Sequence, residues 1–351
     1  MYYISRNYKS LFNAAGKAKT DCEFSLEALG FKNLGFKQSS IPSSAIGTIK
    51  NFFGISMALL RLPFKSTICT QYPNNKFRKL ILFFAKLKRC KIITIVHDVR
   101  CLKGRVKDIE AELSKIVCSD VIIVHNDAMK AWFLEQHTTI PIVVLGIFDY
   151  VSKEKPLQNK DINKNDAYSI AYAGGFAEGK NSYIFDFDIL EHSKYNLKLY
   201  GMGFDPNKRK VSEEASVIFY QGAFPSDQIA YKIEADFGLV WDGISTKSCS
   251  GDLGAYLKYN NPHKTSLYLL CGLPVIVWDQ AAIASFIVEN NLGISISNLK
   301  DLNTVLENLT EEAYKTMKNN VLNVQEKVMK GQFVETAVKK ALETVNNVSL
   351  T

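Results

Sequence analysis

The stretch NNPHKTSLYLLCGLPVIVWD, residues 260–279, predicts a helix that leads directly into a buried strand. Asn261 suits the N-cap of this helix, and Pro262 suits its first position, where a missing N–H costs nothing. Gly272 suits the left-handed residue that ends a helix. The apolar, β-branched run Val275–Trp278 that follows is typical of a buried parallel strand.

The first turn of this predicted helix carries His263 and Lys264. Backbone N–H groups and the positive end of the helix dipole attract anions, and a Lys in the same turn adds a positive charge. A cation at this end is unfavourable by about 0.3–1 kcal/mol unless an anion offsets it. We therefore predict an anion site at Asn261, His263 and Lys264. A solvated Lys with no ligand is the alternative.

Short apolar strands followed by helices recur along the whole chain. Strand 91–96 ends at His97-Asp98, and strand 169–173 ends at Gly174-Gly175. Such alternation predicts parallel sheets joined by right-handed crossovers. We expect two doubly wound α/β domains, and the predicted boundaries are a first domain at 1–150, a polar linker at 151–167, a second domain at 168–331 and a closing C-terminal helix at 332–351.

The opening segment predicts a second place where a phosphate could bind. Strand 2–5 is followed by a loop containing Gly16 and Lys17, and then by a helix over 21–29. This order presents backbone N–H groups to an anion. A helix start with an exposed Lys explains the same residues equally well.

The net charge of +8 is unevenly distributed along the 351 residues. Residues 1–150 contain 22 Lys and Arg against 11 Asp and Glu, and the remaining residues contain 21 against 24. This asymmetry predicts an anionic partner for the first half. The basic amphipathic segment 76–90 is compatible with packing on a sheet and with contact to an anionic bilayer.

Several classes of protein lack support in the sequence. The seven Cys show no metal-like spacing, which predicts reduced thiols and a cytoplasmic location. There is no P-loop, HExxH or GxSxG motif, and no nucleic-acid-binding signature. Asp186-Phe-Asp188 lies in an aromatic, helix-like segment, so we expect a solvated helix face there and no metal site.

Segments of the second half resemble the donor domain of bacterial GT-B glycosyltransferases. These segments are Asn260–Lys264, Leu270–Val277, Ala281–Ile283 and Glu289–Gly293. Residues 13–21 and the end of strand 91–96 are similar to the N-terminal half of the same group, which includes β-1,6-galactofuranosyltransferases and streptococcal adhesin glucosyltransferases. The resemblance implies the GT-B fold, with two Rossmann-like domains facing across a cleft.

The resemblance also implies roles for residues of the second half. Lys264 would contact the donor diphosphate with help from Lys180, beside the turn Gly174-Gly175. Tyr220 would pack on the uracil of the donor. The backbone at Ala281-Ala282 would face the sugar or the phosphates. Gly16 and Lys17 of the first half would close on the diphosphate.

We therefore expect a glycosyltransferase of cell-surface polysaccharide synthesis. It would move a hexosyl group, with galactofuranosyl favoured over glucosyl or galactosyl, from a UDP-sugar to a glycan hydroxyl. Asp98 would be the general base with His97 as its neighbour, and protein cations would replace a metal. Asp279 and Glu289 are ten residues apart, which departs from the ExxxxxxxE pattern of retaining enzymes and favours inversion.

The expected partners follow from the same reasoning. They are the UDP-sugar, a glycan acceptor carried on a lipid, an anionic membrane surface at the cytoplasmic face, and further copies of the chain; no nucleic acid is expected. The competing hypothesis is a catalytically inactive GT-B-like partner that chaperones another glycosyltransferase.

Overall fold

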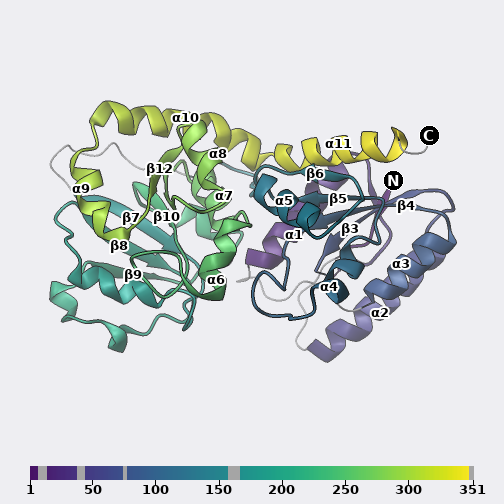
Figure 1. The fold of residues 1–351 in the computed structure, drawn as a ribbon, viewed down its shortest axis with the longest axis horizontal. Helices are drawn as coiled ribbons and strands as arrows, with labels where there is room; N and C mark the ends of the chain where they lie inside the picture. The colour runs from purple at the N-terminus through teal and green to yellow at the C-terminus, as the bar shows by residue number, and fades with distance from the viewer. Residues whose placement is uncertain (7–13, 38–43, 74–76, 157–166, 348–351) are drawn as a thin grey trace. The chain divides into compact units, whose positions relative to one another are not determined.

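The computed structural model describes residues 1–6, 14–37, 44–73, 77–156 and 167–347. The chain forms two units, each built on a six-stranded parallel sheet with helices (Figure 1). It passes from unit 1 to unit 2 after Asp149 and returns to unit 1 after Lys330. No helix in the described part is long and apolar enough to span a bilayer.

The sheet of unit 1 has the strand order β2-β1-β3-β4-β5-β6, and all neighbours are parallel. Its strands are β1 (Tyr2–Tyr3), β2 (Lys32–Asn33), β3 (Thr67–Tyr72), β4 (Lys91–Val96), β5 (Val121–Val124) and β6 (Ile142–Val144). Its helices are α1 (Ala14–Ala28), α2 (Ser44–Arg61), α3 (Arg78–Leu87), α4 (Ile109–Ile116), α5 (Asp127–Glu135) and α11 (Gln332–Asn347). The strand order reverses between β1 and β3.

The sheet of unit 2 has the order β12-β11-β10-β7-β8-β9, again all parallel. Its strands are β7 (Tyr168–Ala173), β8 (Tyr195–Tyr200), β9 (Ile218–Gly222), β10 (Phe237–Val240), β11 (Val275–Trp278) and β12 (Gly293–Ile296). Its α-helices are α6 (Gly251–Ala255), α7 (His263–Leu270), α8 (Ala284–Glu289), α9 (Leu302–Glu307) and α10 (Glu311–Met329). The strand order reverses between β7 and β10, so both units are doubly wound as predicted.

Helix α7 and strand β11 form the predicted junction of a helix and a buried strand. Gly272 has φ of +71°. Its N–H donates to Leu269 O at 3.1 Å, and Leu273 N donates to Tyr268 O at 2.9 Å. This pair of bonds is a Schellman motif. The predicted start is wrong by one residue, because Pro262 is the N-cap and its carbonyl already accepts from the first turn.

Helix α1 begins earlier than the sequence analysis predicts. The predicted loop at Gly16 and Lys17 is wrong, because both residues lie in the first turn of α1. Lys17 forms an ion pair with Asp21, one helical turn later. Three nearby alanines favour the helix strongly enough to offset the cost of one Gly.

Helix α3 packs on the sheet of unit 1 through its apolar residues Ile81, Leu82 and Ala85. The apolar Leu87 is exposed, whereas Arg78 is buried. Arg78 Nε donates to Lys115 O at 2.7 Å, and its guanidinium lies over the Tyr72 ring. Burial lowers the pKa of Arg78 to about 10. The basic character of the segment therefore concealed one structural arginine.

The C-terminal helix α11 completes the core of unit 1. Its buried side packs with residues of β4 and β5. Asp149, where the chain leaves unit 1, accepts from Phe333 N at 3.2 Å and from Val334 N at 2.8 Å at the start of α11. These two hydrogen bonds join the residue where the chain leaves unit 1 to the helix that begins where it returns.

Candidate functional site

In doubly wound sheets, ligands bind beyond the carboxyl ends of the strands, where the strand order reverses. In unit 2 this point lies between β7 and β10. The turn Gly174-Gly175 follows β7, and Trp241 and Asp242 follow β10. A bridge between Asn181 and Gly243 ties the two connecting segments together. The fold therefore brings the predicted glycine turn to the expected ligand position.

The turn Gly174-Gly175 leaves its backbone open to a ligand. A β-carbon added to Gly175 would meet no described atom within 4 Å. Gly174 N donates to Tyr200 O at 2.9 Å. Gly201, the residue after Tyr200, has φ of +146°, and a β-carbon there would lie 1.9 Å from Gly174 O. Only glycine permits this approach, so Gly201 is required for the backbone of Gly174 to pack against it.

Lys264, in the first turn of α7, is the predicted cation of this site, and only 9% of its side chain is exposed. Its ammonium lies 3.0 Å from Asp242 Oδ1, 3.5 Å from Trp241 O and 4.2 Å from the centroid of the Tyr172 ring. An ammonium has three N–H donors, and these two oxygens accept from two of them. Burial lowers the pKa of Lys264, and Asp242 opposes this effect.

Asp242 organises the site, although it was not among the residues predicted from the sequence. Its Oδ1 accepts from Tyr172 Oη at 2.9 Å as well as from Lys264. Asn181 Nδ2 in turn donates to Tyr172 Oη and to Gly175 O, both at 3.0 Å. This network links the lysine to the carbonyl of the open turn. The available signal was an Asp directly after a predicted strand.

Lys180 supplies a second positive charge near Lys264. Its Nζ lies 3.7 Å from the position that a β-carbon on Gly174 would occupy. The pKa of Lys264 is lowered mainly by burial and further by the charge of Lys180. The two lysines, with the carboxylate of Asp242 between the connecting segments, put positive charge beside the turn, which favours an anionic ligand.

Tyr220 lies within β9, two residues before the end of the strand. Its exposed ring stacks on Phe204 with 5.0 Å between centroids and 22° between planes. Tyr220 Oη donates to Gly201 O at 2.9 Å. A ring held by these two contacts is suited to packing against another flat group.

The other residues predicted for the donor site make protein contacts. The His263 ring stacks on Tyr150 at 4.7 Å, and Asn261 is buried. The N–H groups of Ala281 and Ala282 donate to backbone carbonyls at 3.0 and 2.8 Å. Their roles in ligand binding stay predictions, and these two amides serve the backbone in this structure.

The predicted base and its neighbour follow β4 in unit 1. His97 is buried, its Nε2 lies 2.6 Å from Gln71 Oε1, and its ring stacks on Phe148 at 5.0 Å. The Asp98 side chain is 30% exposed and pairs with Lys103 Nζ at 2.5 Å. Asp98 is thus accessible to a substrate, whereas His97 is packed in the core.

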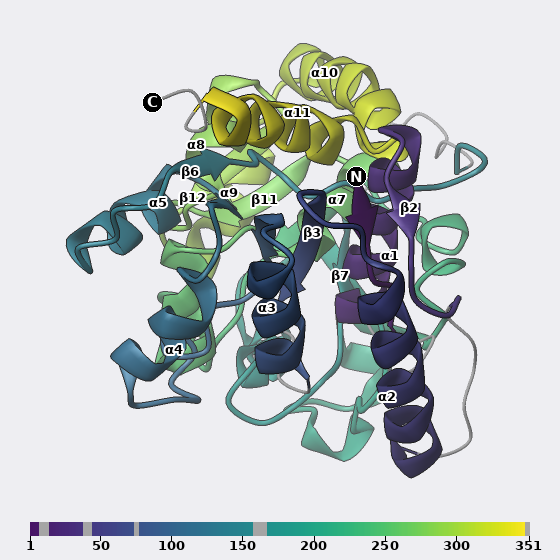
Figure 2. The same ribbon diagram turned by 90° about the vertical axis from the view of Figure 1, so that its right-hand side faces the viewer.

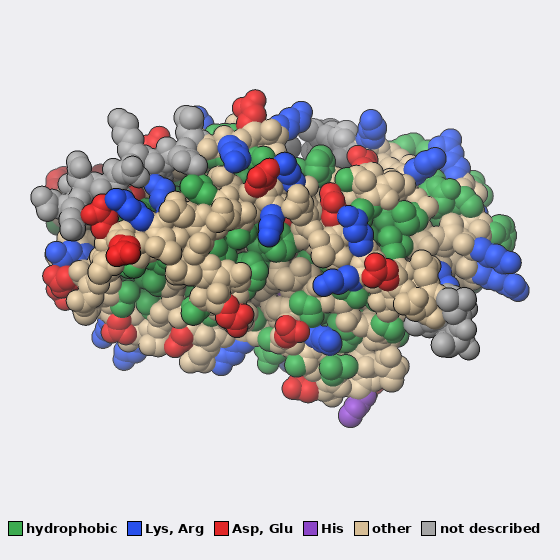
Figure 3. All heavy atoms as spheres, turned by 90° about the horizontal axis from the view of Figure 1, so that it is seen from above, with side chains coloured by type: hydrophobic (Ala, Val, Ile, Leu, Met, Phe, Trp, Pro, Cys, Tyr) green, Lys and Arg blue, Asp and Glu red, His purple; other side chains and the backbone are tan. Residues whose placement is uncertain are grey.

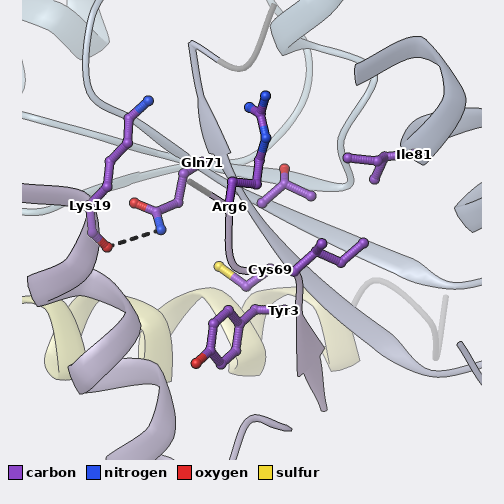
Figure 4. A pocket seen from close by; sticks show the side chains of 8 residues that line it. Tyr3, Arg6, Lys19, Cys69, Gln71 and Ile81 are labelled. Atoms are coloured by element: carbon purple, nitrogen blue, oxygen red, sulfur yellow. Dashed lines mark hydrogen bonds between the residues drawn. The ribbon is translucent and has the colours of Figure 1, made fainter. Parts of the chain in front are cut away.

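The reversal point of unit 1, between β1 and β3, holds a narrow cavity of about 20 Å³ (Figure 4). Such a volume accommodates about one water molecule. The side chains of Arg6, Lys19 and Gln71 line it, and Lys19 Nζ donates to Pro73 O at 2.8 Å. Burial lowers the pKa of Lys19 to about 8, and the charge of Arg6 adds to this effect. Side chains therefore occupy most of this point.

The acidic pair Asp186 and Asp188 lies on a 3-10 helix, η1 (Ser182–Ile189). Asp186 pairs with Lys210, and Asp188 Oδ1 accepts from Ser216 Oγ at 2.7 Å and from Val217 N at 3.1 Å. The expected solvated face is therefore wrong for Asp188, which is buried and joins η1 to the segment before β9.

Comparison with known proteins identifies the family of the chain. Residues 1–147 match the glucosyltransferase 3-like N-terminal domain, and residues 170–341 match the glucosyltransferase 3-like C-terminal domain. The chain belongs to the glucosyltransferase 3-like family. It is therefore a glycosyltransferase, which transfers a sugar from a nucleotide sugar, and the expected enzyme class is confirmed.

Two curated relatives of this glucosyltransferase 3-like protein match along nearly their whole length. β-1,6-Galactofuranosyltransferase WbbI of Escherichia coli strain K12 is 28% identical over 98% of each chain. Glucosyltransferase 3 of Streptococcus gordonii is 24% identical over 97% of this chain and 98% of the relative.

Solved structures share the fold of this glucosyltransferase 3-like protein. Anabaena Alr3699/HepE in complex with UDP and glucose has a TM-score of 0.58 and 12% identity, with 99% of each chain covered. The lipopolysaccharide outer core galactosyltransferase WaaB has a TM-score of 0.57 and 13% identity, covering 97% of this chain and 99% of the other. The predicted GT-B fold is confirmed.

Proposed function

We propose that this enzyme transfers a hexosyl group, with galactofuranosyl favoured, from a UDP-sugar to a hydroxyl of a glycan. The observation that carries the proposal is the Lys264–Asp242 pair, with Lys180 nearby, beside the open turn of unit 2. The similarity to a galactofuranosyltransferase supports the favoured sugar. The shared fold with a protein solved in complex with UDP supports the nucleotide.

In this proposal the diphosphate of the donor lies against Gly175. The remaining N–H direction of Lys264 and the ammonium of Lys180 stabilise the UDP anion as it leaves the sugar. Asp242 holds Lys264 in place before the reaction, so little reorganisation is needed when negative charge develops. Tyr220 offers its exposed ring to the uracil.

Asp98 of unit 1 takes the proton of the acceptor hydroxyl in the same proposal. Its carboxylate is accessible, whereas His97 is held by Gln71 and Phe148 and maintains the geometry of the strand end. Direct attack by the activated hydroxyl inverts the anomeric centre, so an α-linked donor gives a β-linked product.

A donor panel tests the proposal with the whole protein. Melting shifts are measured with UDP-galactofuranose, UDP-galactose, UDP-glucose and UDP-N-acetylglucosamine, and UDP release is measured with a mixture of glycan acceptors. We expect the largest shift with UDP-galactofuranose and faster UDP release when acceptor is added. Stabilisation by UDP without release would instead support the inactive partner protein. A protein that none of the nucleotides stabilises would contradict the donor site itself.

A further inference from the structure

Helix α2 is apolar on two opposite sides. One side, including Ile55 and Leu59, is buried in a core with α3 and the strands of unit 1. The other side carries four large apolar residues, Ile46, Ile49, Phe53 and Leu60. They are 50% to 79% exposed, and their spacing of three, four and seven residues places them on one helical face. A surface helix normally turns a polar side to water.

The adjacent helix continues this apolar surface. α2 and α3 contact each other, and both lie toward the viewer in Figure 2. Phe64, just after α2, and Phe83 and Leu87 on α3 are 60% to 69% exposed. We call the seven residues Ile46, Ile49, Phe53, Leu60, Phe64, Phe83 and Leu87 the α2/α3 face. Contiguous apolar surface of this kind marks an interaction site.

The segment of chain that carries the α2/α3 face has only positive charges, although Asp120 lines a pocket together with Lys86 and Arg89. Residues 28–97 contain twelve Lys and Arg and no Asp or Glu, whereas the rest of the chain contains 31 Lys and Arg against 35 Asp and Glu. The exposed members near the face are Arg61, Lys65, Lys79, Lys86 and Arg89. Blue and green side chains lie next to each other at the right-hand end of Figure 3, where unit 1 lies.

We propose that the α2/α3 face docks on an anionic lipid bilayer. Exposed apolar side chains on a segment rich in Lys and Arg fit the boundary between acyl chains and negative headgroups. A second copy that docked through the same face fits poorly, because it would bring the same positive charges against this face. The inference goes beyond the proposed function, since it concerns the surface on which the enzyme works.

Flotation of the full chain with lipid vesicles tests this surface. We expect the protein to float with phosphatidylglycerol vesicles at low salt and not with pure phosphatidylcholine vesicles. Salt at about 0.5 M, where the Debye length falls to roughly 4 Å, should weaken the attachment strongly. A protein that stays unbound with anionic vesicles at low salt would overturn the proposal.

Two variants separate the apolar and the charged contributions. Phe53→Ser with Leu60→Ser removes apolar contact, and we expect it to abolish the binding that survives high salt. The second variant combines Arg61→Gln, Lys65→Gln, Lys86→Gln and Arg89→Gln. We expect it to lower partitioning into anionic vesicles by about 100-fold or more, since each basic residue near the surface contributes roughly fivefold.

Matched controls come from unit 2. Ile189→Ser with Val288→Ser removes apolar residues that are 61% and 50% exposed. The charge control combines Lys208→Gln, Lys232→Gln, Lys300→Gln and Lys327→Gln, all at exposed positions. Both controls should float as the original protein does. Equal losses in the controls would show a general charge or solubility effect and contradict the proposal.

Sedimentation of the same variants tests the alternative occupant. If Phe53→Ser with Leu60→Ser dissociates an oligomer and leaves vesicle binding intact, the α2/α3 face is a contact between copies and the proposal fails. UDP-dependent melting shifts and UDP release with a soluble acceptor should be unchanged in every variant. Loss of flotation in these variants with UDP release intact therefore supports the lipid surface, and flotation that persists in both variants counts against it. Absence of UDP release from the original protein counts against the proposed function instead.

Discussion

Each unit has a six-stranded parallel sheet, but the two sheets differ at the point where the strand order reverses. In unit 2, Gly174-Gly175 keeps the backbone open, and a β-carbon on Gly175 would meet no described atom within 4 Å. In unit 1, Arg6 and Lys19 reach into the corresponding point and leave a cavity of about 20 Å³. Topology thus locates a place where a ligand can bind, and side-chain size decides whether that place is open.

The lysines at the two points are held in different ways. Lys264 is paired with Asp242, whose hydrogen-bond network extends to the open turn. Lys19 donates to the backbone carbonyl of Pro73. Burial lowers the pKa of both lysines. In the proposal, unit 2 therefore binds the anionic donor at its reversal point, whereas the candidate base of unit 1 lies beyond β4.

The largest effect is expected from the variant that tests Asp98 of unit 1 as the general base. Asp98→Asn should lower transfer by about 10²–10⁴, the usual contribution of a general base, while the melting shift with UDP stays unchanged. Lys19→Met, at the reversal point of the same unit, is the matched control and should retain transfer. The opposite result, loss with Lys19→Met and none with Asp98→Asn, would move the function of unit 1 to its reversal point.

Removing the cation of unit 2 should have the next largest effect. Lys264→Ala should lower turnover by about 10²–10³, as for loss of one preorganised donor. It also leaves Asp242 buried without its partner, which costs roughly 3–5 kcal/mol of stability. Adding Asp242→Asn removes that charge. The double variant should recover melting temperature but not turnover; recovery of both would make Lys264 a structural residue only.

A substitution that adds one methyl group at Gly175 tests whether the open turn of unit 2 binds the diphosphate. Gly175→Ala should leave the melting temperature unchanged, because its β-carbon has space, yet weaken UDP binding about tenfold where phosphate meets the backbone. Gly201→Ala is the contrasting variant, since its β-carbon would overlap Gly174 O and should lower the melting temperature. Unchanged UDP affinity in Gly175→Ala would place the diphosphate elsewhere.

The lowered pKa of Lys264 predicts a gradual dependence on alkaline pH. The ammonium loses its proton at a pH below the ordinary 10.5 of Lys, and the neutral amine no longer attracts the diphosphate. UDP affinity, measured by calorimetry from neutral to alkaline pH, should therefore fall before ordinary lysines titrate. Lys264→Arg keeps its charge and should remove this decline. A decline that persists in Lys264→Arg would assign it to another group.

Local patterns predicted most of the fold because they are set by neighbouring residues. The alternation of strands and helices gave both doubly wound sheets, and Gly272 marked the end of α7. The start of α1 was missed because Gly16 was taken as a loop residue, although the surrounding sequence favours a helix. The burial of Arg78 has no local signal, because it depends on partners from β3 and from α4.

The candidate site was predicted only where one segment carried the signal. Lys264 and Gly174-Gly175 stand at a helix start and a strand end, which a linear pattern reveals. The network of Tyr172, Asn181 and Asp242 joins a strand and two connecting segments, separated by up to 70 residues. Its members acquire their roles through contacts that only the folded sheet creates.

The smallest expected effect is that of EDTA, which should leave the rate of the transfer reaction unchanged. In the proposal, Lys180 and Lys264 stabilise the leaving diphosphate at the open turn, so the reaction needs no metal for this step. The acidic pair most similar to a metal motif is already engaged, since Asp186 pairs with Lys210 and Asp188 accepts two hydrogen bonds. The rate of UDP release should stay the same after chelation. A rate lost to EDTA and restored by Mg²⁺ or Mn²⁺ would show that the lysines of unit 2 do not act alone, and the contrast between the two units would then have to include a metal.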